Sequence, residues 1–471
     1  MKKITFGTGG WRDIIGDGFT KENVMRVAKG ILMLMKKENK IDKPIIIGYD
    51  RRFLSEDAAK WVAEVFAFNN IKVLFLKRSA PTPFIMHTVL HEKLHYGIEI
   101  TASHNPSKYN GIKLIIEEGK DADVNTTNTL ENFIEEIKEV EYLEFEKALE
   151  KGIISYMENP FNNYIDDILS QLNLDVIKKR GLRVLFDPMH GSGAYPLMVI
   201  LFSARLTVDT QNISKDAYFG GMMPAPTKKT LGVLSENVVN GNYDLGIALD
   251  GDGDRLGIID SKGSYIDANQ ILCMLYYYLL KYKGWKGSVV RNLATTHMLD
   301  KIAKSFNEIC YEVPIGFKYV SSKIEEIDAV LGGESSGGLT VRGHIHGKDS
   351  VYASALFIEM LSVINKSPSE FMSELENIYG KHVLVEDNLT FEADYKNTIN
   401  DILFIKKELP CFSKNISKVN YEDGCKVYFE DDSFVICRFS GTEPLLRIFA
   451  ESNSEEESKI YIDEFKNFLN I

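Results

Sequence analysis

Cysteine is scarce in this sequence, with 5 residues among 471 and no CxxC pair. A disulfide framework is not expected at that density in a chain of this length, which excludes the class of small disulfide-stapled secreted domains and favours a reducing compartment. Positive charge is also in short supply, because 55 Lys and Arg face 67 Asp and Glu for a net charge of −12. That balance argues against a general attraction to nucleic acid or anionic membranes, so an anionic ligand would need locally placed cations.

Long apolar runs are missing too. No segment approaches the ~20 apolar residues of a membrane helix, and the opening MKKITFGTGGWRD lacks the apolar stretch of a signal peptide. We therefore expect a cytoplasmic protein without a membrane or nucleic-acid partner. The chain is long and apolar enough for several domains. Its 471 residues, 44% of them hydrophobic, suffice for three or four domains at roughly 100 to 200 residues each.

Short strand-like runs alternate with helical patterns three times along the chain. The first group contains PIIIGYD, IKVLFL and GIEITA, the second RVLFDPMHGSG and DLGIALDGDGDRLGIID, and the third SVVRNLAT, YEVPIG and AVLGGESSGG. These runs are too apolar to face water, which is typical of the buried sheets of α/β domains. In the first group, Ser55 is expected to cap a helix that begins at Glu56.

The C-terminal part of the chain follows a different pattern. GCKVYFEDDSFVICRFSG predicts a hairpin about residues 431–432, and SEEESKIYIDEFKNFL predicts a closing helix. We therefore expect an α/β fold class, with three successive mixed-sheet α/β domains plus a C-terminal α+β domain. The predicted domain boundaries are 1–157, 158–262, 263–378 and 379–471.

The first loop that points to chemistry is SHNP at residues 103–106, directly after the strand run GIEITA. A hydroxyl at the carboxyl end of a parallel strand lies where open α/β sheets bind their ligands, so Ser103 is a candidate nucleophile. Asn-Pro and Ser also favour turns. On these four residues alone, a plain turn is the preferred interpretation, and the other loops must decide between the two.

The second loop, DGDGDR, holds Asp250, Asp252 and Asp254 between two strand runs. Carboxylates at this spacing can converge on one hard cation, and the glycines let the backbone fold around it. An EF-hand loop begins similarly, but here the sixth position is Arg255 instead of Gly and the twelfth is Ser261 instead of Glu. We therefore expect a Mg²⁺ site with room for a phosphate oxygen. Arg255 either neutralises the aspartates or binds that phosphoryl group.

Two further loops combine glycines with polar side chains. GGESSGG at residues 332–338 offers the Glu334 carboxylate and two hydroxyls, which can bind vicinal sugar hydroxyls, whereas a structural turn has no need of a carboxylate. RFSGTEP at residues 438–444, followed by Arg447, combines exposed backbone N–H groups, two hydroxyls and flanking arginines. Such basic residues are often merely solvated, but the combination predicts a nest for a phosphate dianion.

These loops occur in this order over the whole chain, together with FGTGGWRDIIGDGFTKENV and GYDRRFLSE. The ordered set resembles the α-D-phosphohexomutase superfamily, in its phosphoglucomutase/phosphomannomutase branch. The resemblance implies four domains around a central cleft, each contributing one loop. It also implies an enzyme of carbohydrate metabolism, an isomerase that acts as an intramolecular phosphotransferase and is itself a phosphoprotein.

The resemblance further implies a role for each matching residue. Around the phosphorylated serine, the catalytic positions are Ser103, His104, Arg12, Lys113 and Arg255. The Mg²⁺ ligands are Ser103, Asp250, Asp252 and Asp254. The substrate-binding positions are Gly316, Lys318, Glu334, Ser336, Lys348, Arg438, Ser440, Gly441, Thr442 and Arg447.

The implied reaction interconverts hexose 1-phosphate and hexose 6-phosphate, with Mg²⁺ as cofactor and a hexose 1,6-bisphosphate as intermediate and activator. Glucose is expected as the preferred sugar from the resemblance alone, with mannose tolerated. Gly338 stands where dual-specificity relatives often place His, which weakens any claim of mannose specificity. The partners expected are small-molecule sugar phosphates, and the chain is expected to be a monomer or homodimer. The alternatives are a sugar 1,6-bisphosphate synthase or phosphatase, and a phosphoglucosamine mutase. A non-catalytic binding module would not need Ser103 and the three aspartates together.

Overall fold

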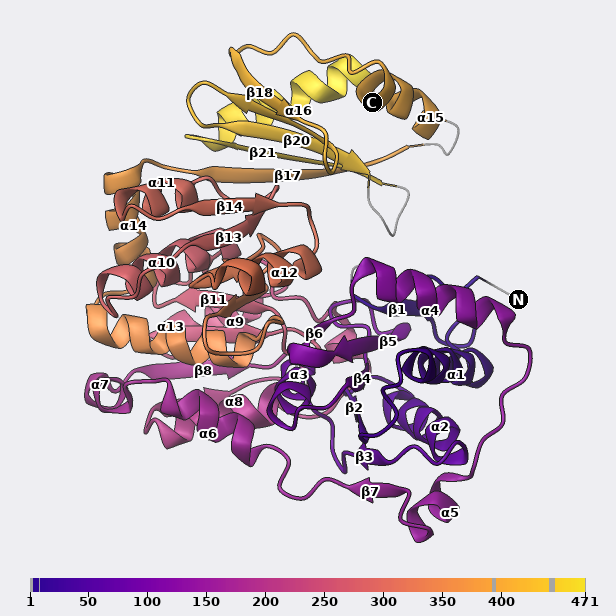
Figure 1. Cartoon of the computed structure of the whole chain (residues 1–471). Helices are drawn as coiled ribbons and strands as arrows, with labels where there is room; N and C mark the ends of the chain where they lie inside the picture. The colour runs from indigo at the N-terminus through magenta and orange to yellow at the C-terminus, as the bar shows by residue number, and fades with distance from the viewer. Residues whose placement is uncertain (1–2, 8, 392–394, 440–444, 471) are drawn as a thin grey trace. The chain divides into compact units, whose positions relative to one another are not determined.

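The computed structural model describes residues 3–7, 9–391, 395–439 and 445–470. The chain divides into two compact units (Figure 1). Unit 1 consists of Met1–Ile271 and Ser336–Ser369, and unit 2 of Leu272–Ser335 and Glu370–Ile471. The fold class expected from the sequence is confirmed: three mixed or parallel sheets with helices are followed by an antiparallel sheet with its own helices.

The first sheet of unit 1 has the strand order β1-β5-β4-β2-β3-β7, with β6 paired to β5. Strands β2, β3, β4 and β7 pair in parallel, whereas β1 and β5 are antiparallel to their neighbours. The strands are β1 (Trp11–Ile14), β2 (Ile45–Tyr49), β3 (Val73–Phe75), β4 (Tyr96–Ile100), β5 (Tyr109–Ile116), β6 (Lys120–Asp121) and β7 (Ile154–Tyr156). The helices are α1 (Lys21–Lys37), α2 (Ser55–Phe68), α3 (Thr82–His91), α4 (Val124–Glu136) and α5 (Phe145–Glu150), with a 3-10 turn at Glu117–Gly119.

Side-chain alternation along the central strands assigns a different set of helices to each face of this sheet. Ile47 belongs to the core cluster formed with α1 and α2. Gly48, the next residue on β2, faces Ile85 of α3, so α3 covers the opposite face (Figure 1). The expected cap at Ser55 is wrong: α2 begins at Ser55 after Leu54, and the Ser55 hydroxyl donates to Asp50 Oδ1 at 2.6 Å instead.

The second sheet of unit 1 has the order β12-β11-β10-β8-β9. β10 is parallel to β8 and antiparallel to β11, so a tight turn joins β10 to β11. The strands are β8 (Arg183–Asp187), β9 (Thr207–Thr210), β10 (Leu245–Leu249), β11 (Leu256–Asp260) and β12 (Tyr265–Ile266). The accompanying elements of unit 1 are α6 (Asn162–Ser170), α7 (Leu174–Arg180), α8 (Ala194–Ser203), α9 (Gly232–Asn240), β16 (Leu339–Val341), α13 (Ser350–Ile364) and a 3-10 turn at Phe219–Gly221.

Unit 2 contains a parallel set of strands in the order β14-β13-β15 and an antiparallel sheet in the order β17-β21-β20-β19-β18. The first set is β13 (Val289–Asn292), β14 (Cys310–Val313) and β15 (Leu331–Gly333), with helices α10 (Ala268–Lys281, which begins in unit 1), α11 (Met298–Ser305), α12 (Phe317–Ile327) and α14 (Pro368–Tyr379). The second is β17 (Val383–Thr390), β18 (Ile416–Asn420), β19 (Cys425–Phe429), β20 (Phe434–Phe439) and β21 (Leu445–Ser452), with α15 (Tyr395–Asn400), a π-helical turn at Asp401–Ile405, and α16 (Glu455–Leu469). The predicted hairpin and closing helix are confirmed as β19–β20 and α16.

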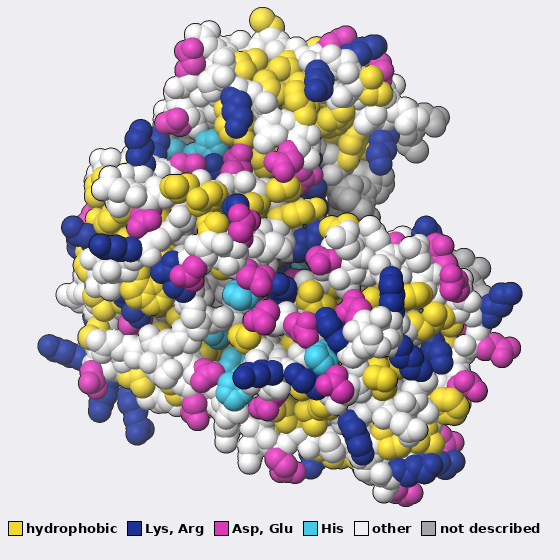
Figure 2. All heavy atoms as spheres, in the orientation of Figure 1, with side chains coloured by type: hydrophobic (Ala, Val, Ile, Leu, Met, Phe, Trp, Pro, Cys, Tyr) yellow, Lys and Arg dark blue, Asp and Glu magenta, His cyan; other side chains and the backbone are white. Residues whose placement is uncertain are grey.

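Helix length and surface charge bear on binding to membranes and nucleic acid. Across the described part of the chain, no helix combines the length and apolar character needed to span a bilayer. On the face seen in Figure 2, Lys and Arg side chains are interspersed with Asp and Glu and do not gather into one basic patch. That distribution accords with the net charge of −12.

Candidate active site

Ser103 lies just beyond the carboxyl end of β4 and is 1% exposed. Its Oγ donates to Asp250 Oδ2 at 3.0 Å and lies 3.3 Å from His104 Nδ1. The residue has φ +52°, a left-handed conformation that costs free energy for a residue with a Cβ. The loop is thus a turn, as its sequence favours, but one whose hydroxyl is directed at a carboxylate.

A single guanidinium holds the backbone of this loop in place. Arg52 is 2% exposed, and its NH2 group donates to Ser103 O at 2.5 Å and to Asn105 O at 2.6 Å. Its NH1 group donates to Pro106 O at 3.0 Å and to Tyr109 O at 3.1 Å. Four carbonyl partners for one buried cation explain how the strained turn is maintained. The sequence analysis missed Arg52, although it lies within the motif GYDRRFLSE.

The three aspartates converge on the turn between β10 and β11. Asp250, Asp252 and Asp254 are fully buried, and each offers a carboxylate oxygen within 4.8 Å of the others. Burial and the two neighbouring carboxylates raise the pKa of Asp250 well above its usual range. Burial also opposes ionisation of Asp254, yet Lys113, Lys348 and Arg255 hold its pKa well below the usual range. The cluster is therefore stable as a charged group only when cations surround it.

Two lysines supply part of that charge. Lys113 Nζ contacts Asp252 Oδ2 at 2.6 Å and Asp254 Oδ2 at 2.8 Å. Lys348 Nζ contacts the same Asp254 oxygen at 2.8 Å. The structure thus brings together residues that lie far apart in the sequence. Gly338 makes room for one of them, because a Cβ there would lie 2.0 Å from Lys348 Cδ.

The donor chemistry of the triad fits Mg²⁺. The Oδ1 atoms of Asp252 and Asp254 are buried and accept no hydrogen bond from the described residues. Buried carboxylate oxygens without partners are costly, and hard oxygen donors of this kind are the ligands that Mg²⁺ prefers. Asp250 Oδ2 and Ser103 Oγ complete an all-oxygen set at the same place.

Two guanidinium groups border the triad and retain unused donors. Arg12 NH1 donates to Asn105 Oδ1 at 2.6 Å, but its buried Nε has no partner among the residues that the structure describes. Arg255 Nε likewise makes no hydrogen bond to the described part of the chain and lies 4.0 Å from Asp254 Oδ1. Burial, together with these two cations, holds the pKa of His104 well below its usual range. A neutral imidazole beside Ser103 can accept a proton.

A buried glutamate on β4 adds a group that the sequence analysis did not select. Glu99 is fully buried opposite Lys113 in the β4–β5 ladder, and neither of its carboxylate oxygens accepts a hydrogen bond from the described chain. Gly48 is required beside it, since a Cβ there would lie 2.4 Å from Glu99 Oε2. Burial and the nearby Asp50 carboxylate raise the pKa of Glu99 well above its usual range.

We expect Glu99→Gln to change how thermal stability depends on pH. Because the folded-state pKa is raised, the folded protein binds more protons at this site than the unfolded chain does, and stability falls as pH rises above the unfolded carboxyl value of about 4.3. As the pH rises above about 5, the Tm of the parent should therefore fall relative to that of Glu99→Gln. The exposed Glu92→Gln serves as the control, and parallel profiles for parent and Glu99→Gln would contradict the assignment.

In unit 2, Glu334 directly follows β15 and is 6% exposed. Its Oε1 atom accepts from Asn292 Nδ2 at 2.8 Å and from Gly316 N at 3.0 Å. Thr295 Oγ1 in turn donates to Asn292 Oδ1 at 2.8 Å and accepts from Ser335 N at 3.0 Å. Two of the predicted substrate residues, Glu334 and Gly316, are therefore in direct contact. Asn292 and Thr295, which orient the carboxylate, carry no motif that the sequence analysis could have used.

The remaining predicted residues occupy separate places. Ser336 is exposed and belongs to unit 1, and Lys318 lies half-buried on α12 with Nζ 5.3 Å from the ring centre of Tyr319. Arg438 on β20 and Arg447 on β21 are register partners across an antiparallel pair, an arrangement of like charges that an anion would stabilise. Ser440, Gly441 and Thr442 lie outside the described residues.

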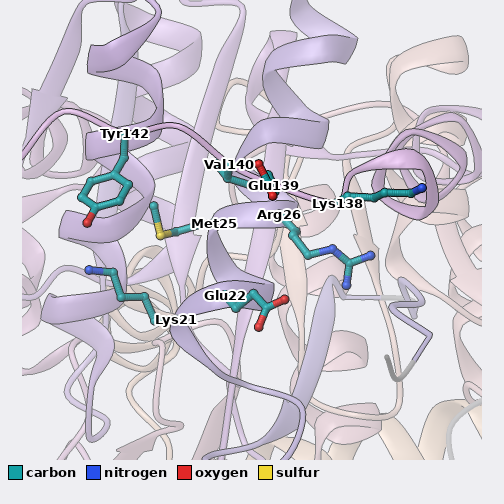
Figure 3. Close-up of a pocket in the computed structure, with 8 residues that line it drawn as sticks. All are labelled: Lys21, Glu22, Met25, Arg26, Lys138, Glu139, Val140 and Tyr142. Carbon is teal, nitrogen blue, oxygen red and sulfur yellow. The ribbon is translucent and has the colours of Figure 1, made fainter.

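A pocket of about 570 Å³ lies elsewhere in unit 1, between α1 and the segment that follows α4 (Figure 3). Lys21, Arg26, Lys138 and Tyr142 are among its lining residues, and no predicted site residue is. Its buried cation, Arg26, donates to Ile134 O at 3.0 Å and Ile137 O at 3.2 Å and is thereby committed to the fold.

Four family models match the chain in succession. They are described as phosphoglucomutase/phosphomannomutase alpha/beta/alpha domain I over residues 3–141, domain II over 162–263, domain III over 267–379, and the C-terminal domain over 382–467. Among curated proteins, a phosphoglucomutase/phosphomannomutase of Thermococcus kodakarensis is 30% identical over 97% of this chain and 96% of its own length. A phosphoglucosamine/phosphogalactosamine mutase of Sulfurisphaera tokodaii is 29% identical over 98% of both chains. A crystal structure assigned to a phosphomannomutase of Thermus thermophilus matches with a TM-score of 0.87 and 26% identity over 100% of both chains.

Proposed function

Because this chain belongs to the phosphoglucomutase/phosphomannomutase family of the α-D-phosphohexomutase superfamily, we propose that it interconverts hexose 1-phosphates and hexose 6-phosphates through a phosphoserine at residue 103. Membership makes it an enzyme, an intramolecular phosphotransferase. The observation that carries the residue-level proposal is the contact of 3.0 Å between Ser103 Oγ and Asp250 Oδ2, beside a buried triad of carboxylates. This contact joins a hydroxyl nucleophile to oxygen ligands for a cation.

The charge distribution around Ser103 suits a phosphoryl group, which carries about −1.5 to −2 when attached to serine. Arg12 and Arg255 each retain an unused buried donor for its oxygens, and Lys113 adds positive charge from the side of Asp252. Members of this superfamily depend on Mg²⁺, which when bound would polarise the phosphoryl group. The ligands that we assign to it are Ser103, Asp250, Asp252 and Asp254.

The transfer step follows from this arrangement. The sugar hydroxyl oxygen bonds to phosphorus as the bond from phosphorus to Ser103 Oγ breaks, and the hydroxyl proton moves to a base. Ser103 Oγ takes up a proton as it leaves and gives it up again when it attacks in the reverse step, and we assign this proton exchange to His104, whose Nδ1 lies 3.3 Å from Ser103 Oγ. The product of this half-reaction is a hexose 1,6-bisphosphate. The reverse step, acting on its other phosphate, restores the phosphoserine and releases the isomerised monophosphate.

We assign the substrate's remaining groups to the other predicted residues. Glu334 Oε1 accepts from two protein donors, so we assign the other carboxylate oxygen, Oε2, to sugar hydroxyls. Ser336, Gly316 and Lys318 complete the sugar assignment. The phosphate that is not being transferred is assigned to Lys348, Arg438, Ser440, Gly441, Thr442 and Arg447.

The proposed sugar preference is glucose, with mannose tolerated and glucosamine poor. Glucose and mannose share their 3- and 4-hydroxyls, so Glu334 and Ser336 do not separate them. The His that dual-specificity relatives often carry is Gly338 here, and its place is taken by the Lys348 side chain. His344 and His346 lie close enough in sequence to supply an imidazole instead, but His344 Nε2 lies 2.6 Å from the buried carboxylate of Asp349 and is engaged there. A phosphoglucosamine mutase is the second candidate, since several curated relatives are described as such and two of them are 29% identical.

A side-by-side measurement of kcat/KM for glucose, mannose and glucosamine 1-phosphates tests this preference. Glucose and mannose should differ by less than about tenfold, because one contact at carbon 2 discriminates only modestly. That glucosamine 1-phosphate is the weakest substrate is expected from the family resemblance alone. A glucosamine preference of about tenfold or more would overturn the proposal. If bisphosphate is released in step with substrate consumption, the alternative of a sugar bisphosphate synthase or phosphatase replaces the mutase. Cytoplasmic location and a monomeric or dimeric state are part of the same proposal.

A further inference from the structure

A chain of hydrogen bonds inside unit 2 connects two predicted substrate residues. These are Arg438, from the predicted phosphate-binding motif at residues 438–444, and Glu334, from the predicted sugar-binding motif at residues 332–338. The connection passes through Asp423, a residue that no motif singles out. Asp423 Oδ1 accepts from Arg438 NH2 at 3.1 Å, and Asp423 Oδ2 accepts from Ile315 N at 2.8 Å. The next residue, Gly316, donates its N–H to Glu334 Oε1 at 3.0 Å. One carboxylate therefore contacts Arg438 directly and is linked to Glu334 through the Ile315–Gly316 peptide.

The turn that carries Asp423 is shaped to place it there. Gly424, which follows it and precedes β19, has φ +100°, a region that favours glycine. A Cβ on Gly424 would lie 2.7 Å from Arg438 Cβ and 2.8 Å from Cys437 O. The turn thus presses its backbone against β20, and that close approach brings the Asp423 carboxylate beside the Arg438 guanidinium.

Ile315 and Gly316 form the other end of the connection. Their successive amides donate to two different carboxylates, Asp423 and Glu334, so the peptide between them is held on both sides. Gly316 has φ +132°, a conformation that only glycine adopts readily, and it immediately precedes α12 as its N-cap residue. A shift of Ile315 would move the Gly316 donor and with it the Glu334 carboxylate, which uses only Oε1 for these contacts.

Arg438 keeps a donor for a ligand while it holds Asp423. Its buried Nε has no hydrogen-bond partner within the described ranges, and its pairing with Asp423 uses NH2 alone. A phosphate dianion bound to Arg438 would share the guanidinium with Asp423 and change the strength of that ion pair. Through Ile315, the same carboxylate also fixes the backbone that orients Glu334.

We propose that Asp423 is a positioning residue that couples phosphate recognition by Arg438 to sugar recognition by Glu334, an inference that rests on the proposed function. Asp423 touches neither the sugar nor the reacting phosphoryl group. It acts by aligning Arg438 on one side and the Ile315–Gly316 peptide on the other. Its loss should therefore weaken phosphate binding and also alter discrimination between sugars.

Binding of glucose 1-phosphate, measured by calorimetry in a Ser103→Ala background that cannot turn over, tests the coupling. Asp423→Asn keeps an oxygen for Ile315 N but loses the charge that attracts Arg438. We expect it to weaken affinity about tenfold, and Arg438→Ala to weaken it about ten- to a hundredfold. The double variant should bind glucose 1-phosphate no more than about threefold more weakly than Arg438→Ala alone, because both substitutions disrupt the same interaction. Fully additive losses would overturn the proposal.

The second readout is the ratio of kcat/KM for glucose 1-phosphate and its 4-epimer, galactose 1-phosphate, in enzyme with Ser103 intact, because Glu334 is assigned to the 3- and 4-hydroxyls. Asp423→Ala, which also removes the acceptor of Ile315 N, should change this ratio by about threefold or more. An unchanged ratio would contradict the sugar side of the coupling. Asp431→Asn, in the same antiparallel domain and paired with Lys414, is the matched control and should change neither readout. Failure of the Ser103→Ala parent to bind any hexose phosphate would instead overturn the proposed function, and this inference with it.

Discussion

Ser103→Ala is expected to lower the turnover of glucose 1-phosphate by about a thousandfold or more, while the Tm changes little. The substitution removes the oxygen that receives the phosphoryl group. The folded state loses only a contact of 3.0 Å to Asp250 and one of 3.3 Å to His104, in a turn that is clamped through backbone carbonyls by Arg52. A coupled assay of net isomerisation and a thermal melt measure the two effects.

The matched control is Ser362→Ala, a buried serine of unit 1 whose hydroxyl donates to Ile358 O at 2.7 Å within α13. It should retain parental turnover. If Ser103→Ala kept turnover comparable to that of this control, Ser103 could not be the phosphoryl carrier. A large fall in Tm for Ser103→Ala would instead indicate a structural role.

Removal of divalent cations should have an effect of similar size. A strong chelator is expected to abolish isomerisation, and added Mg²⁺ to restore it, because the triad has buried carboxylate oxygens without partners among the described residues, and a cation held there would polarise the phosphoryl group. Asp252→Asn should weaken Mg²⁺ binding in calorimetry and lower turnover by about a hundredfold or more. This variant keeps an oxygen but removes one charge from the cation site.

Asp209→Asn is the control for this experiment. Asp209 lies on β9 of the same unit, where its carboxylate accepts from the hydroxyl of Tyr243 at 2.7 Å. It should leave both the affinity for Mg²⁺ and the turnover unchanged. Full activity in the presence of the chelator would contradict the cation requirement, and unaltered Mg²⁺ affinity in Asp252→Asn would remove that aspartate from the ligand set.

The loops at residues 103–106 and 250–255 could be predicted from the sequence because each follows a clear strand pattern. GIEITA and DLGIALD are runs too apolar for anything but buried strands, so the polar residues after them had to gather where those strands end. The meeting of Ser103 with Asp250 was expected only from the family resemblance. Lys113 and Lys348 were also placed by resemblance, and the structure brings both to Asp254.

The supporting residues could not be predicted, for a physical reason. Arg52, Asn292 and Asp423 act through hydrogen bonds to backbone groups or single side chains far away in the chain, and neither periodicity nor spacing encodes such partners. Ser55 illustrates the same limit. A serine at the start of a helix predicts a cap, but the buried Asp50 carboxylate offers its hydroxyl a stronger, charge-assisted partner.

The most direct test of the phosphoserine mechanism is the mass of the enzyme after incubation with glucose 1,6-bisphosphate, followed by peptide mapping. The account predicts an increase of about 80 Da, the mass of one phosphoryl group, located on Ser103 and lost again when glucose 1-phosphate is supplied. Isomerisation by an enzyme that never carries this mass, or that carries it on another residue, would contradict the account.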